Sequence, residues 1–232
     1  VSRPMPDLQI LYEDNHLLIV NKPAGMLVQG DSTGDTPLSE LVERYLIDKY
    51  DKPGRAFVGV THRIDRPTSG AVLFAKTSKA LARLNAMFQR REIHKVYHAV
   101  VCGAFPQKAG EAKDLLYRNR KQNKSYVVTE PHAEAKRAWL TYERLAVGDR
   151  YSLLAVTLHT GRHHQIRTQL SHMGYPIKGD LKYGAPRSNK DGGISLHARI
   201  LSFEHPVTHE HIEVVAPYPE DDAIWSLLSH TK

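Results

Sequence analysis

The sequence has only one cysteine, Cys102, among its 232 residues. A single cysteine excludes an intramolecular disulfide, which fits a protein of a reducing compartment. The sequence also lacks an apolar run long enough to cross a bilayer, and its amino end carries no hydrophobic signal-peptide segment. We therefore expect a cytoplasmic protein without a membrane partner.

Long linkers, low-complexity tracts and internal repeats are absent as well. A chain of this length with 41% hydrophobic residues can form a sizeable core, and we expect one domain over residues 1–232. Acidic residues are the minority charge, 25 against 32 Lys plus Arg, which leaves a formal net charge of +7. This excess favours a polyanionic partner such as a nucleic acid.

Apolar periodicity predicts two helices followed by a series of strands. Thr36 as N-cap and Pro37 as first residue suit the start of one helix, and a second is expected after Thr77 or Ser78. From Ile93 the pattern changes to extended segments separated by Gly, Pro and Asn, which indicates an α+β fold with a mainly antiparallel sheet and flanking helices. The expected strands are residues 9–12, 16–21, 96–101, 124–128, 138–145, 151–159, 194–203 and 212–215.

Residues 62–70 place one carboxylate, Asp65, among arginines, a proline and two hydroxyls. The segment lies between two apolar runs of strand length. Pro67 fixes its own φ and Gly70 permits a tight return of the chain, so the flanking strands are expected to hold Asp65 in place. Taken alone, this pattern also fits a turn aspartate that binds nearby backbone amides.

The sequence of this segment, His-Arg-Ile-Asp-Arg-Pro-Thr-Ser-Gly, resembles the catalytic signature of the RluA family of RNA pseudouridine synthases. The aspartate of that signature is essential for catalysis in the family. The similarity extends from about residue 8 to residue 217, with two small departures: Ile64 stands where leucine is usual, and His163 fills a variable position. Five further segments resemble family motifs in the family's order: Asn21–Gly25, Lys95–Ala99, Leu158–Leu170, Gly179–Gly184 and Leu196–Ala198.

The resemblance implies a single catalytic domain, with a mixed, mainly antiparallel sheet and an active cleft across its middle. It implies an isomerase that breaks the N1 glycosidic bond of a uridine in RNA, turns the base and joins C5 to the same ribose carbon. No metal or organic cofactor is implied. Larger family members carry an additional S4 RNA-binding domain, which we do not expect here because the family pattern begins by about Leu8. The sequence gives no indication of oligomeric state.

Three residues match the catalytic positions of the family. Asp65 is expected to act at the ribose, either as a nucleophile or as a base. Tyr97 is expected to hold the target base by stacking, which contributes roughly 1–3 kcal/mol per base, although simple strand packing also explains a tyrosine here. Arg167 is the expected counter-ion of Asp65, and the spacing of Ile166 and Leu170 places it on an amphipathic helix. The alternative is a surface arginine.

A second set of side chains is expected to contact RNA. Arg63 can enter the space left by an extruded nucleotide, and a structural salt bridge explains it equally well. Residues 118–124 form a basic segment in a predicted surface loop, for which a merely solvated loop is the alternative. The resemblance adds Lys22, Arg162 and His164, which are expected to line the cleft or to hold phosphates. The predicted RNA-binding residues are Arg63, Lys22, Arg162, His164, Arg118, Arg120, Lys121 and Lys124.

Other functions explain less of the sequence. A noncatalytic RNA-binding protein that retains the fold accounts for the charge but not for the matched catalytic residues. Glycoside hydrolysis usually needs paired acids, and no second carboxylate stands out near Asp65. The three histidines within residues 205–211 lack a completing ligand, so we expect no metal site. We expect an enzyme that acts on structured RNA, either tRNA or rRNA.

Overall fold

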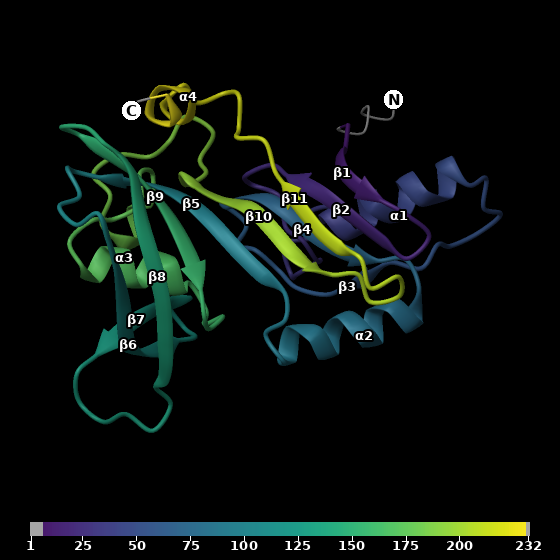
Figure 1. The fold of residues 1–232 in the computed structure, drawn as a ribbon, viewed down its shortest axis with the longest axis horizontal. Helices are drawn as coiled ribbons and strands as arrows, with labels where there is room; N and C mark the ends of the chain where they lie inside the picture. The colour runs from purple at the N-terminus through teal and green to yellow at the C-terminus, as the bar shows by residue number, and fades with distance from the viewer. Residues whose placement is uncertain (1–6, 231–232) are drawn as a thin grey trace. The chain divides into compact units, whose positions relative to one another are not determined.

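The computed structural model describes residues 7–230 (Figure 1). Residues 1–6, on which the expected lack of a signal peptide partly depends, and residues 231–232 lie outside the described part. The described part of the chain divides into two compact units, of which the first comprises residues 7–94 together with Ala198–Pro217. The second unit comprises Lys95–His197 and residues 218–230. Between residues 7 and 230, no helix combines the length and the apolar character needed to cross a membrane.

The first unit is a sheet with two helices. Its strands lie in the order β1, β2, β4, β10, while β3 pairs with β4 and β11 with β10. The first two residues of β10 belong to the second unit. The elements are β1 (Gln9–Glu13), β2 (Leu17–Lys22), α1 (Leu38–Lys49), β3 (Gly59–Val60), β4 (Ser69–Ala75), α2 (Ser78–Gln89), β10 (Leu196–Glu204) and β11 (His211–Val215).

The two helices begin in different ways. α2 starts as predicted, because the Thr77 hydroxyl accepts the N–H of Ala80 at 3.1 Å. The predicted N-cap of α1 is wrong by one residue. Pro37, in an extended conformation with ψ 162°, is the N-cap itself, and its carbonyl accepts the N–H of Glu40 at 3.1 Å. Thr36 therefore lies outside the helix.

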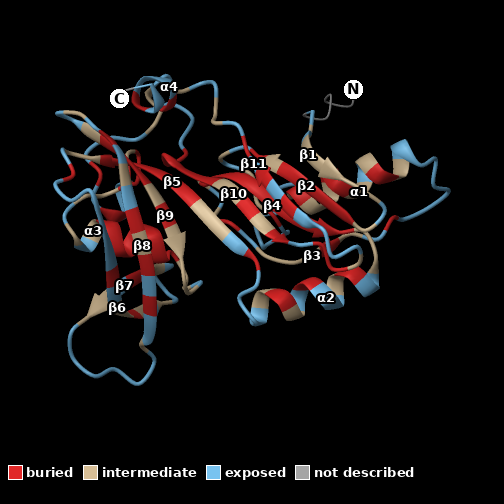
Figure 2. Ribbon diagram, viewed as in Figure 1, coloured by how far each residue is buried: buried red, intermediate tan, exposed pale blue. Residues whose placement is uncertain are grey.

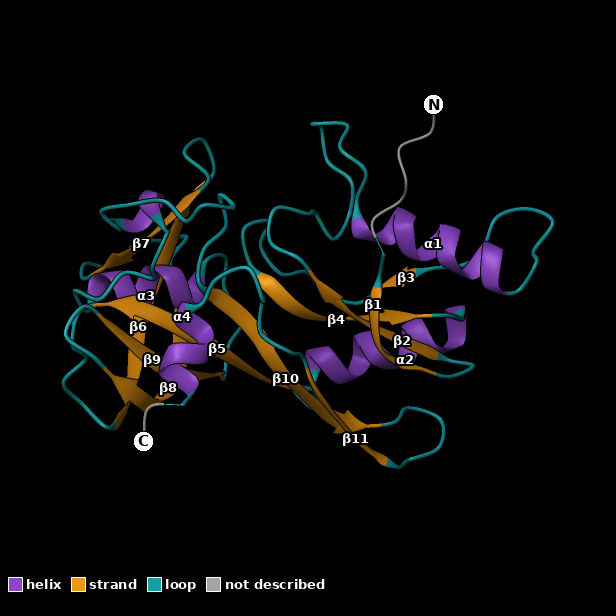
Figure 3. Ribbon diagram, turned by 90° about the horizontal axis from the view of Figure 1, so that it is seen from above, coloured by secondary structure: helices purple, strands orange, loops and turns teal. Residues whose placement is uncertain are grey.

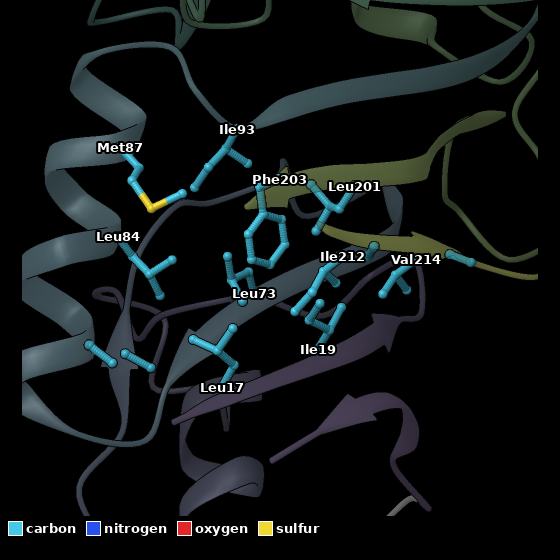
Figure 4. Close-up of a cluster of buried hydrophobic side chains, with 14 residues drawn as sticks. Leu17, Ile19, Leu73, Leu84, Met87, Ile93, Leu201, Phe203, Ile212 and Val214 are labelled. Carbon is cyan, nitrogen blue, oxygen red and sulfur yellow. The ribbon is translucent and has the colours of Figure 1, made fainter. Parts of the chain in front are cut away.

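A buried apolar cluster joins α2 to the sheet of the first unit. Figure 4 shows Leu84 of α2 facing Leu73 of β4, with Phe203 of β10 beside them. Burial of each such side chain contributes about 1.5–3 kcal/mol. Nearly every residue of β2 and β4 is buried (Figure 2). This packing gives rigid support to the ends of both strands, where Lys22 and Gly70 lie.

The second unit is an antiparallel sheet in the order β5, β9, β8, β6, β7. Helix α3 packs against β6 and β7, and α4 packs against β8 and β9 (Figure 3). The elements are β5 (His94–Cys102), β6 (Ala109–Asn119), β7 (Lys124–Val128), β8 (Lys136–Val147), β9 (Tyr151–Leu158), α3 (Gln165–His172), the 3₁₀ turn η1 (Leu181–Tyr183) and α4 (Ile224–Ser229).

The predicted α+β class with a mixed, mainly antiparallel sheet is confirmed, and the expected strands are present with ends shifted by up to two residues. Two local predictions need correction. The surface loop predicted at residues 118–124 is present but shorter, because residues 120–123 form an exposed turn while Arg118 and Asn119 belong to β6 and Lys124 to β7. Helix α3 is not amphipathic, because all of residues 165–170 are buried. The central cleft and the single domain stay predictions.

Candidate active site

Asp65 lies half-buried in the loop between β3 and β4. Its carbonyl accepts the N–H of Thr68 at 2.9 Å, which closes a tight turn. The next residue, Arg66, accepts the N–H of Gly25 at 2.8 Å and donates from Nε to the Gly25 carbonyl at 2.9 Å. These bonds attach the Asp65 loop to the turn that follows β2, so the carboxylate is held in a defined position.

Lys22 connects the same two segments from inside. It is fully buried, and its Nζ donates to the carbonyl oxygens of Pro23, Met26 and Arg66 at 3.0, 2.7 and 3.0 Å. Burial lowers the pKa of Lys22 to about 7, although the negative charge of Asp65 acts in the opposite direction. Because all three N–H groups are bound to carbonyls, the predicted phosphate contact does not fit Lys22. Its position instead orders the backbone around Asp65.

Both ends of the Asp65 loop are fixed by close contacts. Gly70 has φ +120°, and a Cβ there would lie 2.4 Å from both the N and the O of Ala198, so only glycine permits this approach of β4 to β10. At the other end, His62 Nε2 accepts the N–H of Leu73 at 3.0 Å, and its ring stacks on Phe88 with centroids 5.0 Å apart. The loop therefore has little freedom to move Asp65.

In the second unit, Arg167 projects from α3 and is only 5% exposed. Its Nε and Nη2 donate to the two carboxylate oxygens of Asp180 at 2.7 and 2.9 Å. Its Nη1 donates to His164 Nε2 at 3.3 Å, and the centroid of the Tyr183 ring lies 5.0 Å from the guanidinium Cζ. A bidentate pair of this kind fixes both the position and the plane of the guanidinium.

His164 supports Arg167 from the N-cap of α3, where it adopts a left-handed conformation with φ 52°. Since its Nε2 accepts from Arg167, its proton must be on Nδ1, which lies 2.8 Å from the Tyr183 hydroxyl. Burial and then the charge of Arg167 lower the pKa of His164 to about 2, so the ring is neutral. These contacts point to support of Arg167 rather than to the predicted phosphate contact.

Tyr97 is a buried residue of β5, opposite Val156 of β9, and its side chain is 7% exposed. The alternation of a strand places Lys95 on the same face. Burial lowers the pKa of Lys95. Tyr97 and Lys95 thus lie on the same face of β5.

A basic groove of about 730 Å³ opens in the second unit between the β6–β7 hairpin and the segment before α3. It contains one carboxylate, that of Glu134, against an excess of positive side chains. Such a groove suits a phosphate backbone. Its positively charged lining residues are Arg118, Arg120, Lys121, Lys136 and Arg162, and His163 lines it as well.

A family model described as RNA pseudouridylate synthase matches residues 16–172, about two thirds of the chain. The chain belongs to this family. The pseudouridine synthase match includes Asp65, Tyr97 and Arg167, which the sequence singles out as catalytic. The chain is therefore an RNA-modifying isomerase, as predicted, and the roles of these three residues stay predictions.

Named relatives agree with the family. The chain is 36% identical over 226 residues to an uncharacterized RNA pseudouridine synthase, YlyB, of Bacillus subtilis (strain 168), covering 96% of this chain and 73% of that protein. It is 34% identical over 230 residues to the ribosomal large subunit pseudouridine synthase D of Xylella fastidiosa (strain Temecula1 / ATCC 700964), covering 92% and 67%. The structure of human RNA pseudouridylate synthase domain containing 4 superposes with a TM-score of 0.76 at 22% identity, covering 92% of this chain and 89% of that one.

The predicted site residues of this pseudouridine synthase fall into two groups. Asp65, Lys22 and the exposed Arg63 belong to the first unit, and all the others belong to the second. Four predicted RNA contacts line the basic groove together, whereas Lys124 lies against the rings of Tyr126 and Tyr183. The groove residues are Arg118, Arg120, Lys121 and Arg162.

Sequence reasoning assigned no role to Asp180 or Tyr183, which hold Arg167. A signal was present, because both lie in the motif at residues 179–184. A buried arginine also needs a carboxylate partner.

Proposed function

We propose that this pseudouridine synthase modifies specific uridines in structured RNA, with Asp65 as the essential carboxylate. The observation that carries the proposal is the fixation of Asp65. Its loop is closed by a turn, attached to the segment after β2, and lies near the buried ammonium of Lys22. A carboxylate held in this way is preorganised for attack at, or proton removal from, a ribose.

The reaction itself needs no cofactor. The N1–C1′ bond breaks, a C5–C1′ bond forms, C5 loses a proton and N1 gains one. Tyr97 would hold the detached uracil by stacking while it turns. Arg167, fixed by Asp180, would supply positive charge to the reacting carboxylate, and Arg63 would occupy the space left by the extruded nucleotide.

Large-subunit ribosomal RNA is the substrate that we propose to test first, because relatives of this chain are named ribosomal large subunit pseudouridine synthases. Transfer RNA is the second. Either substrate agrees with the excess of positive charge and with the basic groove. A cytoplasmic site of action is part of this proposal.

The test is to incubate the purified chain with unmodified ribosomal and transfer RNA and to map new pseudouridines by site-resolved sequencing. Asp65→Asn should form none while its unfolding transition matches that of the unmutated chain. The matched control is Asp48→Asn, which neutralises an exposed carboxylate on α1 and should leave the product unchanged. Turnover by Asp65→Asn at the rate of the unmutated chain would exclude Asp65 as the essential group.

A further inference from the structure

The hairpin that carries much of the basic groove has a buried residue, Ser125, which contacts the segment before α3. We use "basic hairpin" for residues 118–128, the end of β6, its turn and β7. Ser125, 2% exposed, lies directly opposite Arg118 in the antiparallel ladder. A shift of the hairpin that moves Arg118 must therefore move Ser125 as well.

Ser125 makes three polar contacts with the region that holds Arg167. Its hydroxyl lies 2.9 Å from the carbonyl oxygen of His163 and 2.8 Å from His163 Nδ1. Asn123 Oδ1, an acceptor, lies 3.0 Å from His163 Nε2, so Nε2 carries the proton of the neutral ring, and the Ser125 hydroxyl has two acceptors for its one proton, His163 Nδ1 and the His163 carbonyl. In addition, the backbone N–H of Ser125 donates to the Tyr183 hydroxyl at 2.9 Å. The serine is thus the buried contact of the hairpin, and exposed contacts of the turn add to it: the contact of Asn123 Oδ1 with His163 Nε2, and that of Lys182 Nζ, which donates to the Asn123 carbonyl at 3.0 Å.

From Ser125 the contacts continue to the arginine in two short routes. His163 stacks on His164 with ring centroids 3.7 Å apart, and His164 accepts from Arg167. Tyr183 contacts both His164 and the Arg167 guanidinium. Burial and neighbouring cations lower the pKa of His163 to about 4, so its ring is neutral in this network.

We propose that Ser125 and His163 are positioning residues that couple docking of the basic hairpin on RNA to the orientation of Arg167. The inference rests on the proposed function, in which RNA lies in the basic groove and Arg167 serves the reaction. His163 lines the groove and stacks on His164, the N-cap residue of α3. It would transmit the position of the hairpin to the N-terminus of α3.

Two variants interrupt the network with small changes of volume. Ser125→Ala removes the hydroxyl but keeps the backbone bond to Tyr183, and His163→Phe keeps an aromatic ring over His164 but loses the ring nitrogens. The matched control is Ser152→Ala in β9. Ser152 is 0% exposed, and its hydroxyl also makes two bonds at 2.8 Å, to Phe105 N and Gly103 O, which lie outside the basic groove and the Arg167 network.

The readouts are RNA affinity and the single-turnover rate of pseudouridine formation at saturating RNA, with unfolding followed in parallel. Ser125→Ala and His163→Phe should each lower the saturated rate roughly 3- to 10-fold. The double variant should lose no more than the larger single effect, because both changes break one network. Ser152→Ala should lose similar stability without a change in saturated rate.

Any of the following outcomes would contradict the proposed coupling between the basic hairpin and Arg167. A weaker affinity with an unchanged saturated rate would mean that the hairpin only holds RNA. An equal loss of rate in Ser152→Ala would mean that the effect is general destabilisation. Unchanged affinity and rate would remove Ser125 and His163 from the mechanism. Absence of product from the unmutated chain would instead count against the proposed function itself.

Discussion

Replacing Gly70 by alanine tests whether the close approach of β4 to β10 fixes the Asp65 loop. Alanine at this position lowers the free energy of unfolding in two ways. The φ of +120° is a conformation that residues with a Cβ adopt only under strain, about 1–3 kcal/mol. The new methyl group would also lie 2.4 Å from the Ala198 backbone, and relief of such overpacking costs about 1–3 kcal/mol more.

The expected loss in the free energy of unfolding is therefore about 4 kcal/mol, a large part of the 5–15 kcal/mol typical of a domain. Two further glycines separate the two costs. Gly25 has φ +91° but no atom within 4 Å of an added Cβ, so Gly25→Ala should lose only the strain, about 1–2 kcal/mol. Gly54 has neither feature, and Gly54→Ala should change stability by less than about 0.5 kcal/mol.

Equilibrium urea unfolding of the three variants gives the comparison directly. The loss should increase in the order Gly54→Ala, Gly25→Ala, Gly70→Ala. Pseudouridine formation by the folded fraction of Gly70→Ala should fall as well, because the alanine displaces the loop that carries Asp65. A Gly70→Ala variant as stable as Gly25→Ala would refute the reasoning, since it would show that β4 and β10 separate at no cost.

Three further predictions concern charged groups. Burial raises the pKa of Glu13, but hydrogen bonds from four neighbouring side chains outweigh it and lower the pKa to about 2. Glu13→Gln should therefore cost about 2 kcal/mol at neutral pH. This difference from the unmutated chain should disappear as the pH falls from 4.5 to 2 in acid-urea titrations, and its persistence at pH 2 would contradict the assignment. Asp180→Asn should lower the unfolding free energy by about 3 kcal/mol and slow pseudouridine formation, because an amide offers Arg167 one acceptor oxygen instead of two. An unchanged rate would show that the bidentate pair is dispensable. Replacing three cations of the basic hairpin by glutamine should reduce the slope of log affinity against log salt by about 2–3, whereas Lys79→Gln, exposed on α2, should reduce it by less than 1. The three cations to be replaced are Arg118, Arg120 and Lys121. A slope equal to that of the unmutated chain would exclude this hairpin from the RNA interface.

The fold could be predicted where apolar periodicity and turn chemistry coincide. The start of α2 at Thr77 is an example, because a side-chain cap is a local property of the sequence. Strand β6 could not be found in this way. Only Ala112 and Leu116 of its residues are buried, since the strand is held by pairing with β7 and β8 rather than by an apolar face.

For the site, the sequence identifies which residues take part more reliably than it predicts where their side chains point. Asp65 and its constrained loop follow from a local string of residues. Lys22 and His164 are basic or titratable residues in matched motifs, and the resemblance predicts that they line the cleft or hold phosphates. In the structure both side chains are buried, because burial depends on contacts with segments that are distant in the sequence. Similarly, the pairing of Arg167 with Asp180 joins side chains 13 residues apart through tertiary structure.

The way in which Lys22 is bound has a consequence for which substitutions this region tolerates. Its ammonium contacts only backbone carbonyls, those of residues 23, 26 and 66, and no side chain of those residues. Every amino acid offers the same carbonyl. Side chains at positions 26 and 66 are therefore free to vary as far as this contact is concerned, whereas no other amino acid at position 22 provides three N–H donors at the end of a flexible four-carbon chain.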